Sequence, residues 1–376
     1  MIKNIIKLIK SVFFCLFFSG TLSFFSIPPW ISLCILIILY IPEALIYGQK
    51  IRFDGIFYIL LSLCLSILIT ILLEPQNADG FGYYLYPLMA FIFSVIISTQ
   101  TDKERLAHVY LLKISILILC FSVIAEPFLI LNDGEFLNNG LRLAGFSLNP
   151  NYLPYHILAM LICINYINGS VSKKLILFCS IFIILSFSRS GTIFFIIFLL
   201  LSNTLSLSNI RSSVLFLNRY KYLLLIIFGL IIFYFINSVF FDIFSKLNIE
   251  RLNPFSQKDA ISYDSSRFDI LLEYLSMINN APIQGHGVTE GMSQELRAHN
   301  TFLNVWFELG LIGLLLHIGF LIAILARSWV IDKNYLLFSF ILWYSFFINN
   351  VYVLSHTWLL IGIFLGIKSK DIVNEN

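Results

Sequence analysis

Long apolar runs alternate with short polar connections along almost the whole chain. A helix needs about 20 apolar residues to cross a bilayer, or fewer when flanking side chains reach toward the headgroups. The runs that meet this condition lie near residues 11–27, 30–47, 56–73, 83–99, 108–131, 151–168, 172–188, 190–207, 222–241, 301–325, 335–349 and 351–367. The pattern predicts an all-α, polytopic integral membrane protein of about 12 transmembrane helices, with residues 1–376 forming a single transmembrane domain.

Composition supports this prediction. Hydrophobic residues make up 59% of the chain and charged residues 12%, whereas soluble domains have roughly 45–50% and about 25%. The chain therefore has too little polar surface for a water-soluble globule. The six cysteines all fall in apolar runs without a Cys-x-x-Cys spacing, so we expect buried thiols, no disulfide framework and no metal site.

The basic residues predict the orientation in the membrane. With a cytoplasmic N-terminus, 17 of the 24 lysines and arginines fall in inner connections or at the inner ends of runs, and every inner connection is basic. We therefore expect both termini in the cytoplasm, and a first run that is retained as a helix rather than cleaved as a signal peptide. Orientation accounts for these charges, so we expect no nucleic-acid partner.

Two predicted outer segments are longer than turns. One runs from about 125 to 150. The other, residues 242–299, is a large periplasmic loop. Within it, "SSRFDILLEYLSMINN" predicts an amphipathic helix that Asp264 or Ser265 caps, and "APIQGHG" ends it. Its predicted apolar face consists of Phe268, Leu271, Leu272, Leu275 and Ile278.

Two arginines on the outer face stand among turn residues. Arg189 lies in "SFSRSGT" and Arg142 lies in "RLAGFSLNPNY". A guanidinium stays charged and binds phosphate oxygens in pairs, so both residues are candidates for holding a phosphate. A snorkelling side chain at a tight hairpin explains Arg189 equally well. Helix capping explains Asn149 and Asn151 but gives Arg142 no role.

A third arginine, Arg267, opens the amphipathic helix. A cation in the first turn opposes the helix dipole, so Arg267 needs a partner. That partner is either a bound anion or simply Asp264 nearby.

The stretch "RAHNTFLNVWFELGLIG" passes abruptly from polar residues to an apolar helix. His299 and Asn300 stand at the boundary. Imidazole has an ordinary pKa of about 6.5, which suits a base near neutral pH, although a histidine here could also be structural. Gly310 and Gly313 would let the helix approach a neighbour closely and fix the histidine. His286 and His356 are secondary candidates on the same face.

These pieces together resemble the O-antigen polymerase/ligase family of bacterial envelope enzymes. The matching stretches are "RLAGFSLNPN", "SFSRSG", "SSRFDILLEYL…APIQGHG" and "HNTFLNVWFELGLIG", in this order and on one predicted side. The last fits the family pattern of His, then Asn, Ser or Gln, nine residues and Gly-x-x-Gly. The resemblance covers roughly residues 140–325.

The resemblance implies a metal-independent, inverting glycosyltransferase at the periplasmic face of the inner membrane, without a cofactor. It implies His299 as general base, and Arg189 and Arg267 as ligands of the donor pyrophosphate; we add Arg142, and Asn300 as a substrate-binding residue. The expected partners are an undecaprenyl-pyrophosphate-linked oligosaccharide, membrane lipid and a chain-length regulator protein. The chemistry agrees, because pyrophosphate needs charge stabilisation as it leaves and the attacking hydroxyl needs a base.

Four hypotheses are open for this set of residues. We favour an O-antigen polymerase, since the chain is short, has a compact outer loop and is rich in Ile, Phe, Asn and Lys, as that group commonly is. An O-antigen ligase would transfer the glycan to lipid A-core and needs the same base and cations. A lipid-linked glycan flippase would place charges along the middle of several spans, where this sequence has few. A purely structural membrane protein would pair the arginines with nearby acids.

Overall fold

The computed structural model describes residues 2–47, 55–73, 81–130, 144–147, 149–202, 273–287, 300–331, 335–348 and 351–366, and all regular elements in these ranges are helices. The helices are Ile2–Phe18 (α1), Thr21–Phe24 (α2), Pro29–Tyr47 (α3), Gly55–Leu73 (α4), Phe81–Ser98 (α5), Asp102–Ile130 (α6), Gly145–Ser147 (η3), Tyr152–Asn168 (α7), Lys173–Leu185 (α8), Arg189–Leu201 (α9), Thr301–Ile331 (α13), Leu336–Ser345 (α14), Val351–Val353 (η6) and Ser355–Gly366 (α15). Residues 273–280 are also helical.

The described helices are apolar enough for a membrane protein. Within α6 and α13, the stretches Asp102–Glu126 and Thr301–Trp329 are long and apolar enough to cross a bilayer, and six shorter apolar helices of 10–17 residues accompany them. The chain is a membrane protein with apolar helices. The predicted all-α class is confirmed for the described residues, because all their regular elements are helices. The count of about twelve spans stays a prediction, and its run near 222–241 lies outside the described residues.

The N-terminal run differs from the prediction of one span over residues 11–27. α1 ends at Phe18, and Gly20 takes a left-handed conformation with φ 79° before α2. A Cβ on Gly20 would lie 2.6 Å from the carbonyl oxygen of Phe146. The helix therefore ends where a distant segment packs against its backbone, and hydropathy alone does not reveal such a contact.

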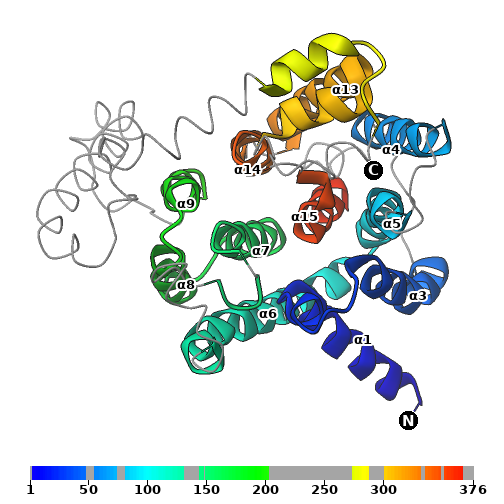
Figure 1. The fold of residues 1–376 in the computed structure, drawn as a ribbon. Helices are drawn as coiled ribbons and strands as arrows, with labels where there is room; N and C mark the ends of the chain where they lie inside the picture. Colours follow the sequence, from blue (N-terminus) through cyan, green and yellow to red (C-terminus); the bar gives the residue numbers. More distant parts are fainter. Residues whose placement is uncertain are drawn as a thin grey trace, which may run out of the picture.

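α15 lies at the centre of the helices, between α5 and α7 (Figure 1). Its side chains from His356 to Leu365 are all buried. A Cβ on Gly362 would lie 2.6 Å from the carbonyl oxygen of Ser94 in α5, so the missing side chain lets the two helices pack closely. A helix that is apolar on all sides is expected at such a central position.

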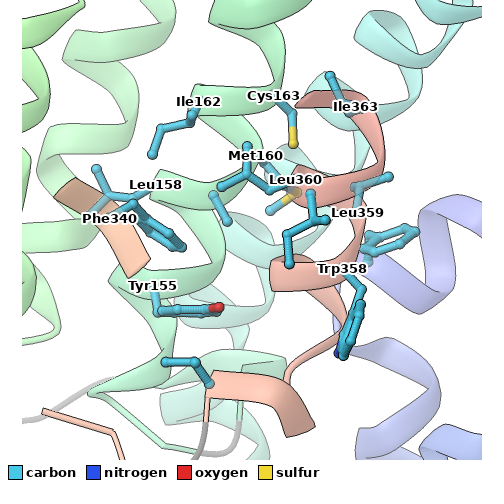
Figure 2. Close-up of a cluster of buried hydrophobic side chains, with 14 of the residues drawn as sticks. Tyr155, Leu158, Met160, Ile162, Cys163, Phe340, Trp358, Leu359, Leu360 and Ile363 are labelled. Carbon is cyan, nitrogen blue, oxygen red and sulfur yellow. The ribbon is translucent and has the colours of Figure 1, made fainter. Parts of the chain in front are cut away.

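The interior between α7, α14 and α15 is filled by large apolar side chains. Figure 2 shows Tyr155 and Met160 of α7 facing Leu360 of α15, with Phe340 of α14 beside them. The rings of Tyr155 and Phe340 lie 4.9 Å apart. The Tyr155 hydroxyl hydrogen-bonds the Thr357 hydroxyl, which satisfies a polar group inside this core.

Two arginines bind the C-terminal ends of α5 and α15, at the end of the bundle that we predict to be cytoplasmic. Arg105 Nη2 donates to the carbonyl of Ser98 (3.3 Å) and Arg327 Nη2 donates to the carbonyl of Leu365 (2.9 Å). Cations are favourable at helix C-termini, where carbonyls lack intrahelical partners. These basic residues therefore have a structural role in addition to the orientation inferred from the sequence.

Candidate active site

The helix that follows the predicted base is broken. Gly310 has φ 67° and ψ −163° inside α13, which separates a first part, Thr301–Leu309, from the long apolar part. In a continuous helix the carbonyls of Phe307 and Glu308 would accept from the N–H groups four residues later. The break removes those partners in a region where unsatisfied backbone groups are costly.

The segment Ala281–Gly287 supplies the missing partners. The backbone N–H of His286 donates to the Phe307 carbonyl (2.7 Å), and that of Gly287 donates to the Glu308 carbonyl (3.1 Å). In return, the N–H of Leu311 donates to the carbonyl of Pro282 (3.0 Å). The "APIQGHG" and "HNTFLNVWFELGLIG" motifs are thus joined through their backbones.

Glycines make this junction sterically feasible. A Cβ on Gly285 would lie 2.5 Å from the Glu308 carbonyl oxygen, and a Cβ on Gly310 would overlap the carbonyl of Ile283. We expected Gly310 and Gly313 to admit a neighbouring element. Gly310 does so, but its neighbour is this loop segment, whereas the space at Gly313 is filled by Val305 and Leu309 of the same helix.

The helical stretch 273–280 lies against the first part of α13. Tyr274 and Ile278 are buried together with Phe307 in a small cluster. The predicted apolar face is therefore partly wrong: Ile278 is buried, but Leu275 is 39% exposed and Tyr274 takes the inner position. The other predicted members of that face lie outside the described residues.

His286 has a structural role at this contact. Its Nε2 donates to the carbonyl of Met277 (2.7 Å) near the end of the helical stretch, and its ring stacks on Phe307 at 4.6 Å. The other secondary candidate, His356, donates from Nε2 to the carbonyl of Phe18 (2.8 Å) and stacks on His156 at 4.1 Å. Both histidines hold elements together.

Asn300 is the cap of α13. Its Oδ1 accepts from the N–H of Leu303 (3.2 Å), which is the geometry of an N-cap. The next residue, Thr301, is fully buried; its hydroxyl donates to the Ile348 carbonyl (2.9 Å) and accepts from the Val351 N–H (3.2 Å). The amide NH₂ of Asn300 is not used by the cap, so the proposed substrate contact of this residue is compatible with it.

Arg189 stands at the start of α9 with an exposed side chain on a fixed backbone. Ser188 caps the helix by accepting from the N–H of Gly191 (3.3 Å), and Phe187 before it is left-handed, with φ 48°. A Cβ on Gly191 would overlap Pro154 of α7. The serines and the glycine of "SFSRSGT" thus form a tight turn that holds the guanidinium at the bundle surface.

The end of α14 connects the starts of α9 and α13. Trp343 Nε1 donates to the carbonyl of Ser190 (3.0 Å). Three residues on, the ring of Phe346 lies 5.0 Å from that of Phe302 in α13. The starts of α9 and α13, which carry Arg189 and Asn300, are therefore on the same end of the bundle.

The "RLAGFSLNPN" motif is fastened to α6 at residues 144–147. The Glu126 carboxylate accepts from the N–H groups of Ala144 and Gly145, both at 2.7 Å, and the Ser122 hydroxyl accepts from the N–H of Phe146 (2.8 Å). Sequence reasoning missed Glu126, although an acid near the end of an apolar run was a usable signal. Arg142, two residues before this anchor, lies outside the described residues.

The asparagines of that motif make a helix start as predicted. Asn149 Oδ1 accepts from the N–H of Asn151 (2.8 Å), and the Asn149 carbonyl accepts from the N–H of Tyr152 (2.9 Å). Asn151 precedes α7 without a side-chain cap of its own. The capping interpretation thus applies to Asn149 alone.

Two further residues of the predicted site, His299 and Arg267, lie outside the described residues. In the sequence, the nearest described residue to His299 is Asn300, and the nearest to Arg267 is Glu273. Among the described residues, no group of three or more His, Cys, Asp or Glu side chains is arranged to hold a metal ion.

Residues 175–318 match the family model described as O-Antigen ligase. This range begins in α8, contains Arg189 and residues 242–299, which we predict to be the periplasmic loop, and ends in α13 after the break at Gly310. Arg142 and its anchor precede it. A comparison with curated proteins gives no match.

Proposed function

Since residues 175–318 carry a domain of the O-antigen ligase/polymerase family, we propose that this membrane protein is an O-antigen polymerase. It would transfer a glycan from undecaprenyl pyrophosphate to the next lipid-linked repeat unit at the periplasmic face. Both termini would lie in the cytoplasm, and a chain-length regulator protein would be a further partner.

One observation carries the proposal. The segment Pro282–Gly287 is joined by backbone hydrogen bonds to the broken first part of α13, whose cap Asn300 directly follows His299. Asn300 lies at the same end of the bundle as the exposed Arg189, and His299 precedes Asn300 directly in the sequence. A polar, basic boundary of this kind suits a substrate with a lipid tail, a pyrophosphate and a sugar.

The proposed reaction is a single displacement. The acceptor hydroxyl oxygen attacks the anomeric carbon, and its proton passes to His299. The bond between the anomeric carbon and the pyrophosphate oxygen breaks, and undecaprenyl pyrophosphate leaves with the electron pair. Arg189, Arg267 and Arg142 stabilise the charge on the leaving group, while Asn300 holds the substrate through its amide. The products are an inverted glycosidic bond and the lipid pyrophosphate.

The envelope glycans of a deletion strain test the function. Loss of the polymerase leaves a single repeat unit on lipid A-core, seen on a lipopolysaccharide gel. No repeat on the core, with polymer accumulating on the lipid carrier, would instead identify a ligase. Repeat units retained on the cytoplasmic side would identify a flippase.

The catalytic assignment is tested by His299→Ala. We expect the variant to reach the membrane in parental amounts and to extend no glycan when given undecaprenyl-pyrophosphate-linked repeat units, because general-base removal costs about 100-fold or more. Chain ladders of parental length would refute His299 as the base.

The role of the exposed cation is tested by Arg189→Lys. Loss of the planar guanidinium removes paired contacts with phosphate, so we expect extension to fall by about 10-fold or more at a retained positive charge. Lys174→Arg is the matched control, since Lys174 is exposed at the far end of α8. Full activity of Arg189→Lys would favour a snorkelling arginine instead.

A further inference from the structure

The end of α14 carries aromatic side chains that the rest of the protein covers only in part. Phe346 is 51% exposed and Phe347 is 42% exposed. The ring of Phe347 lies 4.9 Å from that of Trp343, and the ring of Phe346 lies 5.0 Å from that of Phe302 in α13. We call Phe302, Trp343, Phe346 and Phe347 the aromatic platform. Its two exposed phenyl groups present ring surface to another molecule.

The aromatic platform lies between two polar helix starts, because α14 lies between α9 and α13 (Figure 1). On the α9 side, Trp343 Nε1 donates to the carbonyl of Ser190 (3.0 Å), the residue after the exposed Arg189. On the α13 side, Phe302 follows Asn300 by two residues, and the helix cap uses only the Oδ1 of that asparagine. The platform therefore has a guanidinium on one side and an amide NH₂ on the other.

The first part of α13 reaches the platform because it folds back along the second part. The ring of Phe302 lies edge-on to that of His317 at 4.7 Å, whereas residues 302 and 317 of a continuous helix would lie about 22 Å apart. Nearer the break, a Cβ on Gly313 would lie 3.1 Å from the carbonyl oxygen of Val305. The start of α13 therefore lies beside the second part of the helix and not at its far end.

Hydrogen bonds fix this start next to the end of α14. The Thr301 hydroxyl donates to the carbonyl of Ile348, which follows the two exposed phenylalanines, and accepts from the N–H of Val351. Thr301 is fully buried, so these bonds are shielded from water. Phe302 and Asn300, on either side of Thr301, are therefore held at a fixed place beside the platform.

A glycan linked to pyrophosphate has the groups that match this arrangement. Its pyrophosphate is an anion, which suits the exposed guanidinium of Arg189. Its first sugar presents C–H faces that stack on aromatic rings and hydroxyls that accept from an amide such as that of Asn300. A lipid tail also fits aromatic rings at a membrane boundary, but it has no group for the amide. The combination of rings, amide and cation therefore favours the sugar.

We propose that the aromatic platform stacks on the pyrophosphate-linked sugar of the donor glycan. Phe346 covers one face of this sugar, the Asn300 amide donates to one of its hydroxyls, and Arg189 holds the adjoining pyrophosphate. This inference rests on the proposed polymerase function. It makes Phe346 and Phe347 substrate-binding residues and gives them no part in making or breaking bonds.

Binding is measured on the full-length protein in detergent with two separate probes. One is the repeat-unit oligosaccharide released from its lipid carrier by mild acid, and the other is undecaprenyl phosphate, which has no sugar. Tryptophan fluorescence reports binding, since Trp343 belongs to the platform. We expect Phe346→Leu, which keeps an apolar side chain but loses the ring, to bind the oligosaccharide about 3- to 10-fold more weakly. Phe346→Tyr should bind it within about twofold of the parent, and undecaprenyl phosphate should bind all three proteins equally.

Steady-state kinetics provide a second readout. A stacking contact acts on the bound sugar and on the transition state alike, so Phe346→Leu should raise KM for the lipid-linked repeat unit about 3- to 10-fold with kcat within about twofold. Phe121→Leu is the matched control, because Phe121 is a phenyl group on α6 that is 63% exposed. It should change neither KM nor oligosaccharide binding.

Three results would overturn the sugar site. They are parental oligosaccharide affinity in Phe346→Leu, a Tyr variant as weak as the Leu variant, and a loss in Phe346→Leu that affects undecaprenyl phosphate alone, which would mean that the platform contacts the lipid tail. A parent that binds the oligosaccharide in the expected order of variants but extends no glycan would refute the polymerase function and leave the sugar site intact.

Discussion

Gly310 and Gly362 are both crowded glycines in apolar helices, and they have opposite effects on those helices. Gly362 stays within a regular α15, where the missing side chain brings the carbonyl of Ser94 into contact. Gly310 has φ 67° and interrupts α13, where the carbonyl of Ile283 takes the place of a side chain. Gly362 lets two helices pack closely, whereas Gly310 interrupts a helix so that a loop segment can hydrogen-bond to it.

The difference lies in what satisfies the backbone. At Gly362 the helix keeps its own hydrogen bonds and gains packing contacts. At Gly310 the helix gives up its own bonds, and His286, Gly287 and Leu311 take part in bonds between segments more than 20 residues apart. In apolar surroundings such a break is stable only while the remote segment is present. The break in α13 therefore depends on the segment Ala281–Gly287.

The largest expected effect comes from Gly310→Ala. A Cβ there overlaps Ile283 and opposes the positive φ, so the loop must leave the helix and the turn after His299 loses its support. We expect glycan extension to fall by about 100-fold or more in a protein that still reaches the membrane. Gly319→Ala in the same helix is the control, since its nearest neighbour, Ile59 Cδ1, is 3.9 Å away. A parental chain ladder from Gly310→Ala would contradict the proposed junction.

Gly285→Ala tests the junction from the loop side and should have a smaller effect. Gly285 has φ 76° and would place a Cβ 2.5 Å from the Glu308 carbonyl oxygen. Gly169 has φ 74° with no atom within 4 Å, so Gly169→Ala carries the same backbone strain, about 1–2 kcal/mol, without the clash. We expect extension to fall about 10-fold in Gly285→Ala only. Equal activity of the two variants would mean that the loop does not hold the site.

Gly362→Ala should have the smallest effect on catalysis and a clear effect on stability. Pushing α15 away from α5 costs about 1–3 kcal/mol, measurable as a lower midpoint of thermal unfolding in detergent. Activity per folded molecule should match the parent. Gly55→Ala, at a position with no neighbouring atom within 4 Å, should leave the midpoint unchanged. A catalytic defect in Gly362→Ala that exceeds its loss of folded protein would remove the contrast with Gly310.

Hydropathy predicted those parts of the fold that depend on local sequence. The runs near 30–47, 56–73, 83–99 and 151–168 correspond to α3, α4, α5 and α7 within two residues at each end. These helices satisfy most of their backbone groups internally, although Pro42 in α3 and Pro87 in α5 each lack an N–H, so their lengths follow mainly from their own apolar residues. The same reasoning failed at Gly20 and at Leu275, because the partner of each position comes from elsewhere in the chain.

For the candidate site, the sequence alone determined the residue types, their order and the turn chemistry around Arg189. It also singled out "APIQGHG" and the His299–Gly313 stretch as separate motifs. Only the tertiary structure decided that the two motifs meet, that α13 is broken between them, and that Glu308 is buried at their junction. A glycine inside an apolar run is as compatible with a continuous helix as with a break. The choice is made by long-range backbone hydrogen bonds, which leave no periodic pattern in the sequence.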